Sequence, residues 1–271
     1  MWGTKNISGI ETLATANICA LPFLTKNNVF RSSLAASAIT QLSPKFATFQ
    51  EAYDTHVTRN LRKLLPHYHI VQSGSQSLLN RGGLMTLSKE PIIKWLYIPY
   101  KEQGKWVSMQ ITDRAGGKGF LVIETRSAYV VNAHFTAFYL KHKAFLTFEE
   151  LKTQRAQLLQ TKKFIRTNLR GKLVIFMGDL NFPPRTDLYE ETTRHFMDLT
   201  HGIPGTWSSK RNQHRGSSSK EITEDKLDYI LVYHSKGLQL IRDMFEKIKV
   251  SLFDDESAVL SDHHMVLATE N

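Results

Sequence analysis

The sequence predicts an α/β protein built from two β-sheets that pack face to face under a cover of helices. One observation behind this prediction is a series of about a dozen short apolar runs, many alternating or β-branched, as in strands. Another is a smaller set of longer segments with apolar residues at helical spacing. The third is the composition of the 271 residues, 41% hydrophobic and 22% charged, which is that of a globular protein with a packed core. Layers are the arrangement in which such strands and helices bury their apolar faces.

The predicted strands are distributed along the whole chain. They cover residues 13–18, 46–49, 68–71, 83–87, 95–98, 107–111, 120–123, 129–133, 173–177, 227–232 and 265–268. β-branched and aromatic side chains favour extended backbone, and short continuous apolar runs are typical of strands that are buried on both faces.

The predicted helices cover residues 28–42, 53–65 and 148–169. The third is the best defined, because Thr147 and Glu150 form a capping box at its start and Gly171 follows its end. Its buried stripe consists of Leu151, Leu158, Ile165 and Leu169.

The chain is expected to form a single domain over residues 1–271 and to be a monomer, because no repeat or linker divides it. Polar loops are predicted at 113–119 and 208–224 within that domain. No run approaches roughly 18 consecutive apolar residues, so no transmembrane segment is expected. The first residues carry no signal-peptide pattern, which leaves the compartment open between the cytoplasm and export by another route. Cys19 is the only cysteine; it excludes an intramolecular disulfide and is expected to be a small core residue.

The charge of the chain favours a polyanionic partner. The formal net charge is +10 and the isoelectric point is about 9.6. Nucleic acid, an anionic membrane and a phosphorylated small molecule all suit such a surplus. The alternative is a basic surface with no specific partner.

Three polar residues interrupt or follow predicted strands in the first half of the chain. Asn17 lies inside an apolar strand, where a buried amide needs partners, so it is either a turn residue or a group that binds a ligand or orients a carboxylate. Glu51 follows an apolar strand directly, at a sheet edge that suits a hard oxygen ligand for Mg²⁺. His134 ends a strand and is either structural or a proton-transfer residue.

The strongest single signal is the strand 173–177, which leads straight into Gly178, Asp179, Leu180 and Asn181. Gly178 is expected to permit a tight turn. Asp179 and Asn181 are two residues apart, so on extended backbone they would point the same way and flank a phosphate or a metal-bound water.

A carboxylate and an imidazole are the remaining signals near the C-terminus. Asp228 lies at the start of a predicted strand and His263 just before another. A carboxylate beside an imidazole can fix its tautomer and raise its basicity, which points to general acid–base chemistry. The next residue, His264, is expected on the surface.

With these residues in their order, the chain resembles the endonuclease/exonuclease/phosphatase superfamily, the DNase I-like metallophosphoesterases. The matching strings are TANI (15–18), FQE (49–51), GGLMTLSK (82–89), NAH (132–134), GDLN (178–181), LDYI (227–230) and SDH (261–263). Within the superfamily the chain is most similar to bacterial-type neutral sphingomyelinases, on KGF (118–120), RAQL (155–158) and GTW (205–207). The resemblance implies a four-layer α/β/β/α sandwich of two mixed sheets with outer helices.

The resemblance also implies a metal site and its chemistry. Glu51 would hold a catalytic Mg²⁺, for which Mn²⁺ is a possible substitute, with Asn17 beside it and Asp262 completing the metal shell or supporting the site. Asp179 would orient or help to deprotonate the attacking water, and Asn181 would steady the phosphate oxygens.

The same resemblance implies that the two histidines transfer the protons. Asp228 would hold His263, the expected general base, and His134 would be the general acid; the two imidazole roles can also be exchanged. Arg81, before two glycines, is a candidate phosphate contact.

The substrate has two main candidates. Residues 141–172 carry nine Lys and Arg against two Glu, and aromatic residues lie nearby: Phe135, Phe138, Tyr139, Phe145 and Phe148. This mixture suits an anionic lipid surface such as a sphingomyelin membrane, and it equally suits a nucleic-acid strand; the plain alternative is core aromatics beside a solvated helix face.

These observations lead to three hypotheses of an enzymatic function and one of a function that is not enzymatic. The first is a sphingomyelinase or phospholipase C-like lipid phosphodiesterase, and the second is a DNase I-like or AP-endonuclease-like nuclease. An inositol-phosphate phosphatase is the third, and a scaffold without activity is the alternative to all of them.

Overall fold

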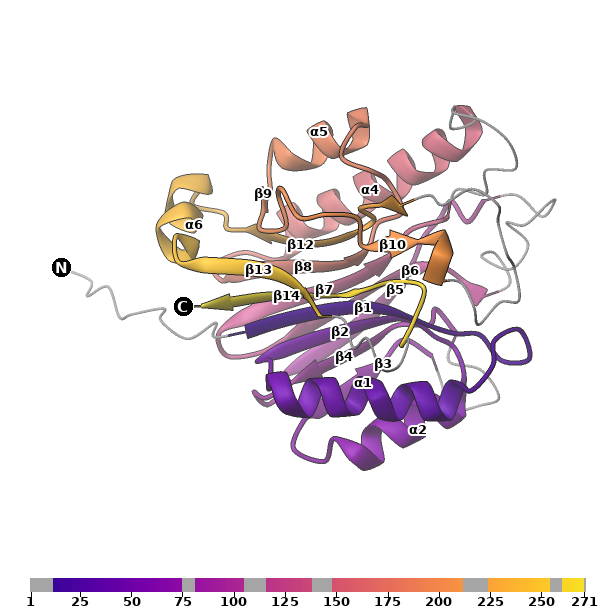
Figure 1. Cartoon of the computed structure of the whole chain (residues 1–271). Helices are drawn as coiled ribbons and strands as arrows, with labels where there is room; N and C mark the ends of the chain where they lie inside the picture. Colours follow the sequence, from indigo (N-terminus) through magenta and orange to yellow (C-terminus); the bar gives the residue numbers. More distant parts are fainter. Residues whose placement is uncertain are drawn as a thin grey trace.

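The computed structural model describes residues 12–74, 81–104, 116–137, 148–211, 224–253 and 260–270, and it confirms the four-layer sandwich. In Figure 1 the helices α1 (Asn28–Leu42) and α2 (Thr55–Leu64) lie below one sheet, and α4 (Phe148–Asn168) and α5 (Asp187–Thr193) lie above the other. The short helix α6 (Leu238–Phe245) packs beside the second sheet. The predicted capping box of α4, Thr147 and Glu150, lies outside the described side chains.

The first sheet has six strands in the order β13-β14-β1-β2-β4-β3. Its strands are β1 (Thr12–Ala20), β2 (Phe46–Ala52), β3 (His69–Gln72), β4 (Met85–Ser88), β13 (Ile248–Phe253) and β14 (Met265–Glu270). The sheet is mixed, because β1 and β2 are parallel and the other pairs are antiparallel.

The second sheet also has six strands, in the order β5-β6-β7-β8-β12-β9. Its strands are β5 (Lys94–Pro99), β6 (Gly119–Glu124), β7 (Ala128–His134), β8 (Leu173–Asp179), β9 (Met197–Asp198) and β12 (Asp228–Tyr233). Here β7 and β8 are the parallel pair. A further two-stranded sheet joins β10 (Trp207–Ser208) to β11 (Glu224–Asp225).

The predicted strands are confirmed wherever the structure describes them, apart from shifts of up to three residues at their ends. The expected strand 107–111 lies outside the described residues. Strand β13 is not predicted from the sequence, although its residues IKVSLF alternate, because Lys249 and Ser251 lower its apolar content. Nor are β9, β10 and β11, which are too short to show a period.

Strand alternation decides which side chains enter the space between the sheets. On β8, Ile175 and Met177 belong to the core between the sheets, whereas Val174 and Phe176 pack in the core beneath α4. The same period of two places the next inward residue at Asp179. The inner faces of the strands therefore change from apolar to polar at one end of the sandwich.

Two members of the expected aromatic and basic surface are buried, whereas Lys152 and Lys163 on α4 and Arg170 just after it are exposed. Phe135 is fully buried, with its ring centroid 5.5 Å from that of Tyr100. Lys162 is buried on α4 and donates to the carbonyl of Glu191 at 2.7 Å. These side chains stabilise the core beneath α4 and are not available to a ligand. The side chains of Phe138, Tyr139, Phe145 and Phe148 lie outside the described residues.

Two further expectations, on membrane-spanning helices and on Cys19, can be compared with the structure. Among the described residues, no helix has both the length and the apolar content that crossing a bilayer requires. Cys19 is buried, as expected of a small core residue.

Candidate active site

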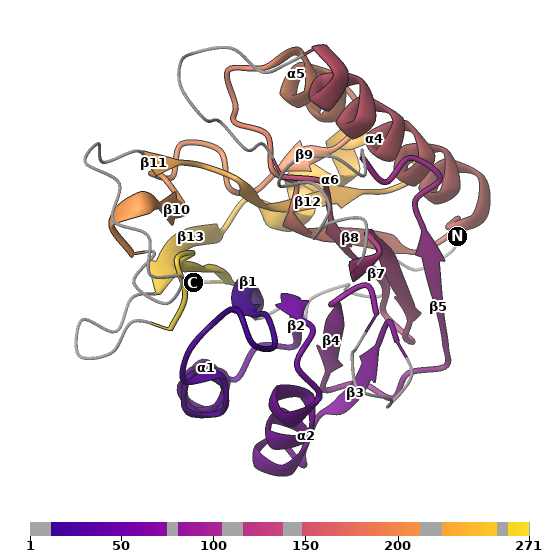
Figure 2. The same cartoon turned by 90° about the vertical axis from the view of Figure 1, so that its right-hand side faces the viewer.

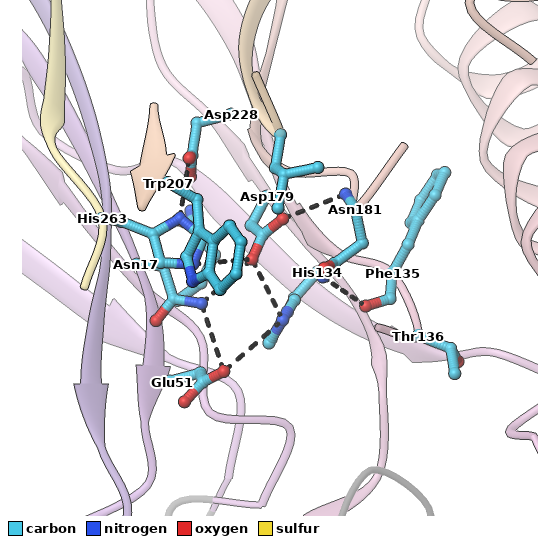
Figure 3. Close-up of polar contacts among 12 residues, drawn as sticks. Asn17, Glu51, His134, Phe135, Thr136, Asp179, Asn181, Trp207, Asp228 and His263 are labelled. Atoms are coloured by element: carbon cyan, nitrogen blue, oxygen red, sulfur yellow. Dashed lines mark hydrogen bonds and ion pairs between the residues drawn. The ribbon is translucent and has the colours of Figure 1, made fainter. Parts of the chain in front are cut away.

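Four strands deliver polar side chains to the same end of the sandwich, on its inner faces. Asn17 lies near the end of β1, and His134 and Asp179 are the last residues of the parallel strands β7 and β8. Asp228 is the first residue of β12, which runs antiparallel to β8 and pairs Asp228 with Asp179. Figure 3 shows these side chains pointing toward one another. The carboxyl ends of parallel strands are a common place for a site, and this edge fits that pattern.

Glu51 reaches the same cluster through an irregular backbone. Alternation along β2 places Phe49 in the core beneath α1 and α2, so the inner face passes through Gln50. Glu51 then has a φ of 53°, and the register between β1 and β2 shifts just beyond Asn17. A residue other than glycine in the left-handed region costs free energy and is typical of functional sites. This turn of the backbone directs the carboxylate toward Asn17.

The amide of Asn17 joins two carboxylates. Its Nδ2 donates to Glu51 Oε1 at 3.2 Å and to Asp179 Oδ2 at 3.0 Å, while its Oδ1 accepts from the Cys19 amide at 3.0 Å. Of the two functional interpretations of Asn17, this geometry supports orientation of carboxylates. A metal-ligand role would use Oδ1, which here bonds to the backbone.

Asp179 is the centre of the cluster and is 1% exposed. Burial raises the pKa of its carboxyl above the ordinary value; the positive charge of His263 partly opposes that shift, and the nearby Asp228 reinforces it. The Asp179 carboxylate therefore requires positive charge and hydrogen-bond donors around it in order to stay ionised.

Asn181 does not lie on extended backbone, so the premise that it points the same way as Asp179 is wrong. Its φ is 53°, and its backbone amide donates to Asp179 Oδ1 at 3.0 Å. Its side-chain Nδ2 donates to the carbonyl of Phe135 at 3.1 Å. Asn181 thus fixes the loop after β8 around Asp179, and its contact with phosphate oxygens stays a prediction.

Asp228 and His263 form a buried carboxylate–imidazole pair. His263 Nδ1 lies 2.8 Å from Asp228 Oδ2, which also accepts from Thr206 Oγ1 at 2.6 Å. Burial by itself would lower the pKa of His263, but Asp228 and Asp179 outweigh it and raise the pKa well above that of a free imidazole. In the absence of a bound cation this favours the protonated ring, with its Nε2 3.8 Å from Asp179 Oδ2; a cation bound among the carboxylates would lower the pKa of His263 toward that of a general base.

Asp262 accepts hydrogen bonds from two residues, Trp207 and Ser261, that were not predicted as site residues. The indole Nε1 of Trp207 donates to Asp262 Oδ2 at 3.3 Å, and Ser261 Oγ donates to Oδ1 at 3.2 Å. The backbone of Trp207 also forms an isolated antiparallel β-bridge with that of His263. Figure 3 shows the Trp207 ring beside the His263 imidazole. These contacts support the second of the two expected roles for Asp262, which is support of the site. The string GTW, which contains Trp207, was the sequence signal available for it.

Lys118 is a further site residue, and the sequence analysis used it only as a family signature. It is 1% exposed, and its Nζ lies 2.7 Å from His134 Nε2. The same Nζ lies 3.0 Å from His134 Nδ1, so the ammonium rests against both ring nitrogens. His134 Nε2 in turn lies 3.5 Å from Asp179 Oδ2 and 4.0 Å from Glu51 Oε1. A buried lysine among carboxylates and a histidine has no ordinary structural explanation, because its charge is costly to bury.

Replacing Lys118 with methionine is expected to lower phosphodiester turnover about tenfold or more, because the His134 ring loses the ammonium that orients it. Thermal stability should stay the same or rise, since methionine keeps the apolar stem and removes a buried charge. Steady-state kinetics and thermal melting measure the two effects. Lys172→Met is the matched control, because Lys172 pairs with Glu124 at the far end of the strands. Full activity of Lys118→Met would contradict this role.

A buried amide network supports the cluster from below. Gln50 Nε2 on β2 donates to Asn132 Oδ1 on β7 at 2.8 Å, and Asn132 Nδ2 donates to the carbonyl of Phe49 at 3.1 Å. Asn132 lies two residues before His134 on the same face of β7. These hydrogen bonds connect the two sheets directly beneath the site and fix their distance there.

The residues of the cluster fit a hard divalent cation. Ligand atoms of Asp179, Asp228 and His263 all lie within 4.8 Å of one another, and all three residues are buried. Within the described part of the chain, Asp228 Oδ1 is buried and has no hydrogen-bond partner. The Glu51 carboxylate lies on the other side of Asn17. The possible metal-ligand atoms of the cluster are therefore mostly oxygen, which suits Mg²⁺ or Mn²⁺. A cation here would offset the cost of the buried carboxylates.

Arg81 lies outside the hydrogen bonds that join the cluster. It is exposed, and its guanidinium rests over Gly117, where a Cβ atom would lie 3.3 Å from Nε. Gly117 is the residue before Lys118, so Arg81 borders the segment that leads into the site. Its contact with substrate phosphate stays a prediction.

A sandwich of this architecture, with two imidazoles and buried carboxylates at one edge, fits the class of phosphoester hydrolases. The sequence pattern described as "Endonuclease/Exonuclease/phosphatase family" matches residues 14–263. The chain belongs to the endonuclease/exonuclease/phosphatase family. Enzymes of this family generally depend on a divalent metal.

Comparison with individual proteins places the fold among DNase I-like hydrolases. The chain is 25% identical over 274 residues to a Drosophila melanogaster protein named "Putative neutral sphingomyelinase", covering 94% of this chain and 59% of that protein's length. The crystal structure of SmcL superposes with a TM-score of 0.76 at 17% identity, over 97% of this chain and 99% of that one. TDP2 of D. rerio, complexed with single-strand DNA product, superposes with a TM-score of 0.69 at 14% identity, over 96% and 98% of the two chains.

Proposed function

We propose that this protein is a divalent-cation-dependent phosphodiesterase that hydrolyses a sphingomyelin-like lipid by attack of water on its phosphodiester. One observation carries the chemistry: His134 Nε2 and His263 Nε2 lie 3.5 Å and 3.8 Å from Asp179 Oδ2. Hydrolysis needs a proton acceptor for the attacking water and a donor for the leaving oxygen. Two imidazoles beside one carboxylate supply both.

Each residue of the cluster has a separate role in the proposed reaction. Asp228 holds His263 by Nδ1, so that Nε2 takes the proton of the attacking water, which Asp179 orients. His134 gives a proton to the leaving oxygen, and the Lys118 ammonium beside it supplies a fixed positive charge. When bound, Mg²⁺ or Mn²⁺ would polarise the phosphoryl oxygens and neutralise developing charge. Glu51, together with a carboxylate of the central cluster, would hold that ion.

The choice of a lipid substrate rests on the matched relative. A protein named as a neutral sphingomyelinase is similar over 94% of this chain. Nucleic acid is the second candidate, because the TDP2 structure contains single-strand DNA product and the chain carries a net charge of +10. The two candidates use the same proton chemistry and differ in what lies around the phosphodiester.

A side-by-side turnover assay tests the proposal. Purified protein is given sphingomyelin vesicles, supercoiled DNA and the soluble diester bis(p-nitrophenyl) phosphate, each with Mg²⁺ and with EDTA. Phosphocholine release is expected with Mg²⁺, and EDTA should lower turnover at least about 100-fold because charge neutralisation by the ion is lost. Readdition of Mg²⁺ should restore it.

The outcomes separate the alternatives. Nicking of DNA without release of phosphocholine would make the protein a nuclease. Turnover that is insensitive to EDTA would remove the metal from the proposal. A folded protein without hydrolysis of any diester would favour a scaffold function.

A further inference from the structure

We infer that the docking loop, residues 21–30 (the loop between β1 and α1 with the first three residues of α1), is the surface by which this protein docks on a phospholipid bilayer. This inference rests on the proposed lipid phosphodiesterase function and names its partner surface. In Figure 1 the indigo loop between β1 and α1 projects from the right-hand end of the molecule, the end at which β1 brings Asn17 into the site.

Exposed apolar side chains are concentrated in this docking loop. Nine large hydrophobic side chains are exposed in the described part of the chain, and four of them lie in the loop. Phe23 is 104% exposed, Leu24 60%, Val29 48% and Phe30 61%. Phe23 also has a φ of 64°, a conformation that is unfavourable for a bulky residue. The fold thus holds this ring in water at a free-energy cost and gains no core contact from it.

The docking loop is braced from within, so its exposed side chains are presented by a defined backbone. Buried Thr25 Oγ1 lies 2.8 Å from the carbonyl of Leu21 and 2.7 Å from Asn28 Oδ1, both within reach of its one O–H. Asn28 Nδ2 donates to Asp54 Oδ2 at 3.1 Å. The buried Arg31 donates by Nε to the carbonyl of Lys26 at 3.1 Å. Thr25, Asn28 and Arg31 are thus buried, whereas the large apolar side chains of the loop are exposed.

Arg31 connects the docking loop to the site. Its Nη1 donates to the carbonyls of Ile18 at 2.7 Å and Leu260 at 2.9 Å. Ile18 follows Asn17, and Leu260 precedes the Ser261–His263 segment. Figure 2, which looks at this end of the molecule, shows the loop in front of β1 and above the start of α1. A surface that receives the docking loop therefore lies beside the catalytic cluster.

The chemistry of the docking loop favours a bilayer over other partners. Aromatic and aliphatic side chains with a neighbouring cation are suited to the boundary between headgroups and acyl chains. Residues 12–50 contain no Asp or Glu, and Lys26 is exposed within the loop, so the loop itself brings no negative charge to the lipid phosphates. A stable protein interface takes about 800 Å² from each partner, which is more than a single convex loop offers. Nucleic acid is bound by rows of cations, and the docking loop has one.

The test compares a docking-loop variant with a matched control. Phe23→Ser/Leu24→Ser removes an aromatic and an aliphatic side chain from the loop. Trp95→Ser/Leu96→Ser removes the same two types from β5, where they are 51% and 47% exposed. In Figure 2, β5 lies at the opposite edge of the molecule from α1. Cosedimentation with phosphatidylcholine vesicles containing a fifth phosphatidylserine is measured in EDTA, so that binding is separate from turnover.

The docking-loop variant is expected to lose at least about tenfold in vesicle affinity, because each large apolar side chain contributes severalfold or more. The β5 control should stay within about twofold of the unmodified protein. Hydrolysis of soluble bis(p-nitrophenyl) phosphate should be unchanged in both variants, because neither touches the catalytic cluster. Hydrolysis of sphingomyelin in vesicles should fall only in the docking-loop variant.

Several results would overturn the inference. Unmodified protein that does not sediment with vesicles, or equal binding by the docking-loop variant, excludes the loop as a bilayer surface. If unmodified protein still releases phosphocholine in either case, the proposed function stands and only the inference fails. Absence of sphingomyelin hydrolysis with normal vesicle binding refutes the function and keeps the surface. Dimerisation or DNA binding that the docking-loop variant loses, without an effect on vesicles, assigns the loop to those partners.

Discussion

Replacement of His263 by alanine is expected to reduce phosphodiester turnover at least about 100-fold while the protein stays folded. The imidazole is the group that Asp228 polarises, with Nδ1 2.8 Å from Asp228 Oδ2. Its loss removes a positioned proton acceptor, and alanine cannot replace it. Folding should survive because Asp228 Oδ2 keeps its hydrogen bond from Thr206 Oγ1 at 2.6 Å. Initial rates on the soluble diester and circular dichroism measure the two effects.

The neighbouring His264→Ala is the control for loss of an imidazole at this point of the chain, and it should retain nearly full turnover. The double variant Asp228→Asn/His263→Ala should be within about threefold of His263→Ala alone, because residues that act as a unit are not additive. A folded His263→Ala protein with near-normal turnover would refute the assignment of the Asp228–His263 pair.

Replacement of Gly178 by alanine is expected to destabilise the protein by about 3 kcal/mol and to lower its melting temperature by roughly 6–12 °C. Gly178 lies within β8, so the expected tight turn is not the reason for glycine. A Cβ atom at this position would lie 2.0 Å from the carbonyl oxygen of Ala133 on the parallel neighbour β7. Backbone cannot move aside as a flexible side chain can, and Gly178 also has a φ of 144°. Thermal and denaturant unfolding measure the loss.

Gly202→Ala separates the two causes. Gly202 has a φ of 82°, and a Cβ atom there would have nothing within 4 Å. That variant should lose only about 1 kcal/mol, the cost of a positive φ for alanine. Similar losses in both variants would show that contact with Ala133 is not the reason for glycine at 178. Because His134 and Asp179 follow the paired residues Ala133 and Gly178, Gly178→Ala should also reduce turnover.

The sequence by itself predicted most of the longer elements and most members of the cluster. His134, Asp179 and Asp228 each stand at an end of an apolar strand and Asn17 lies within one, and strand alternation is a local property of the backbone. The order of the strings around them was enough to name the family, which the match over residues 14–263 establishes. Those inferences needed no knowledge of which strands are neighbours in space.

Only the tertiary structure decided how these residues face one another. Glu51 and Asn181 adopt left-handed backbone, which reverses the direction that alternation assigns to a side chain. Lys118 is distant in sequence from every carboxylate of the cluster, and its burial against His134 depends on β6 lying beside β7. Phe135, expected near a ligand, is enclosed by Tyr100 and Phe182. The physical reason is common to all four: local pattern fixes the period of a strand, whereas contacts made across and between the sheets select each φ, each buried charge and each packed ring.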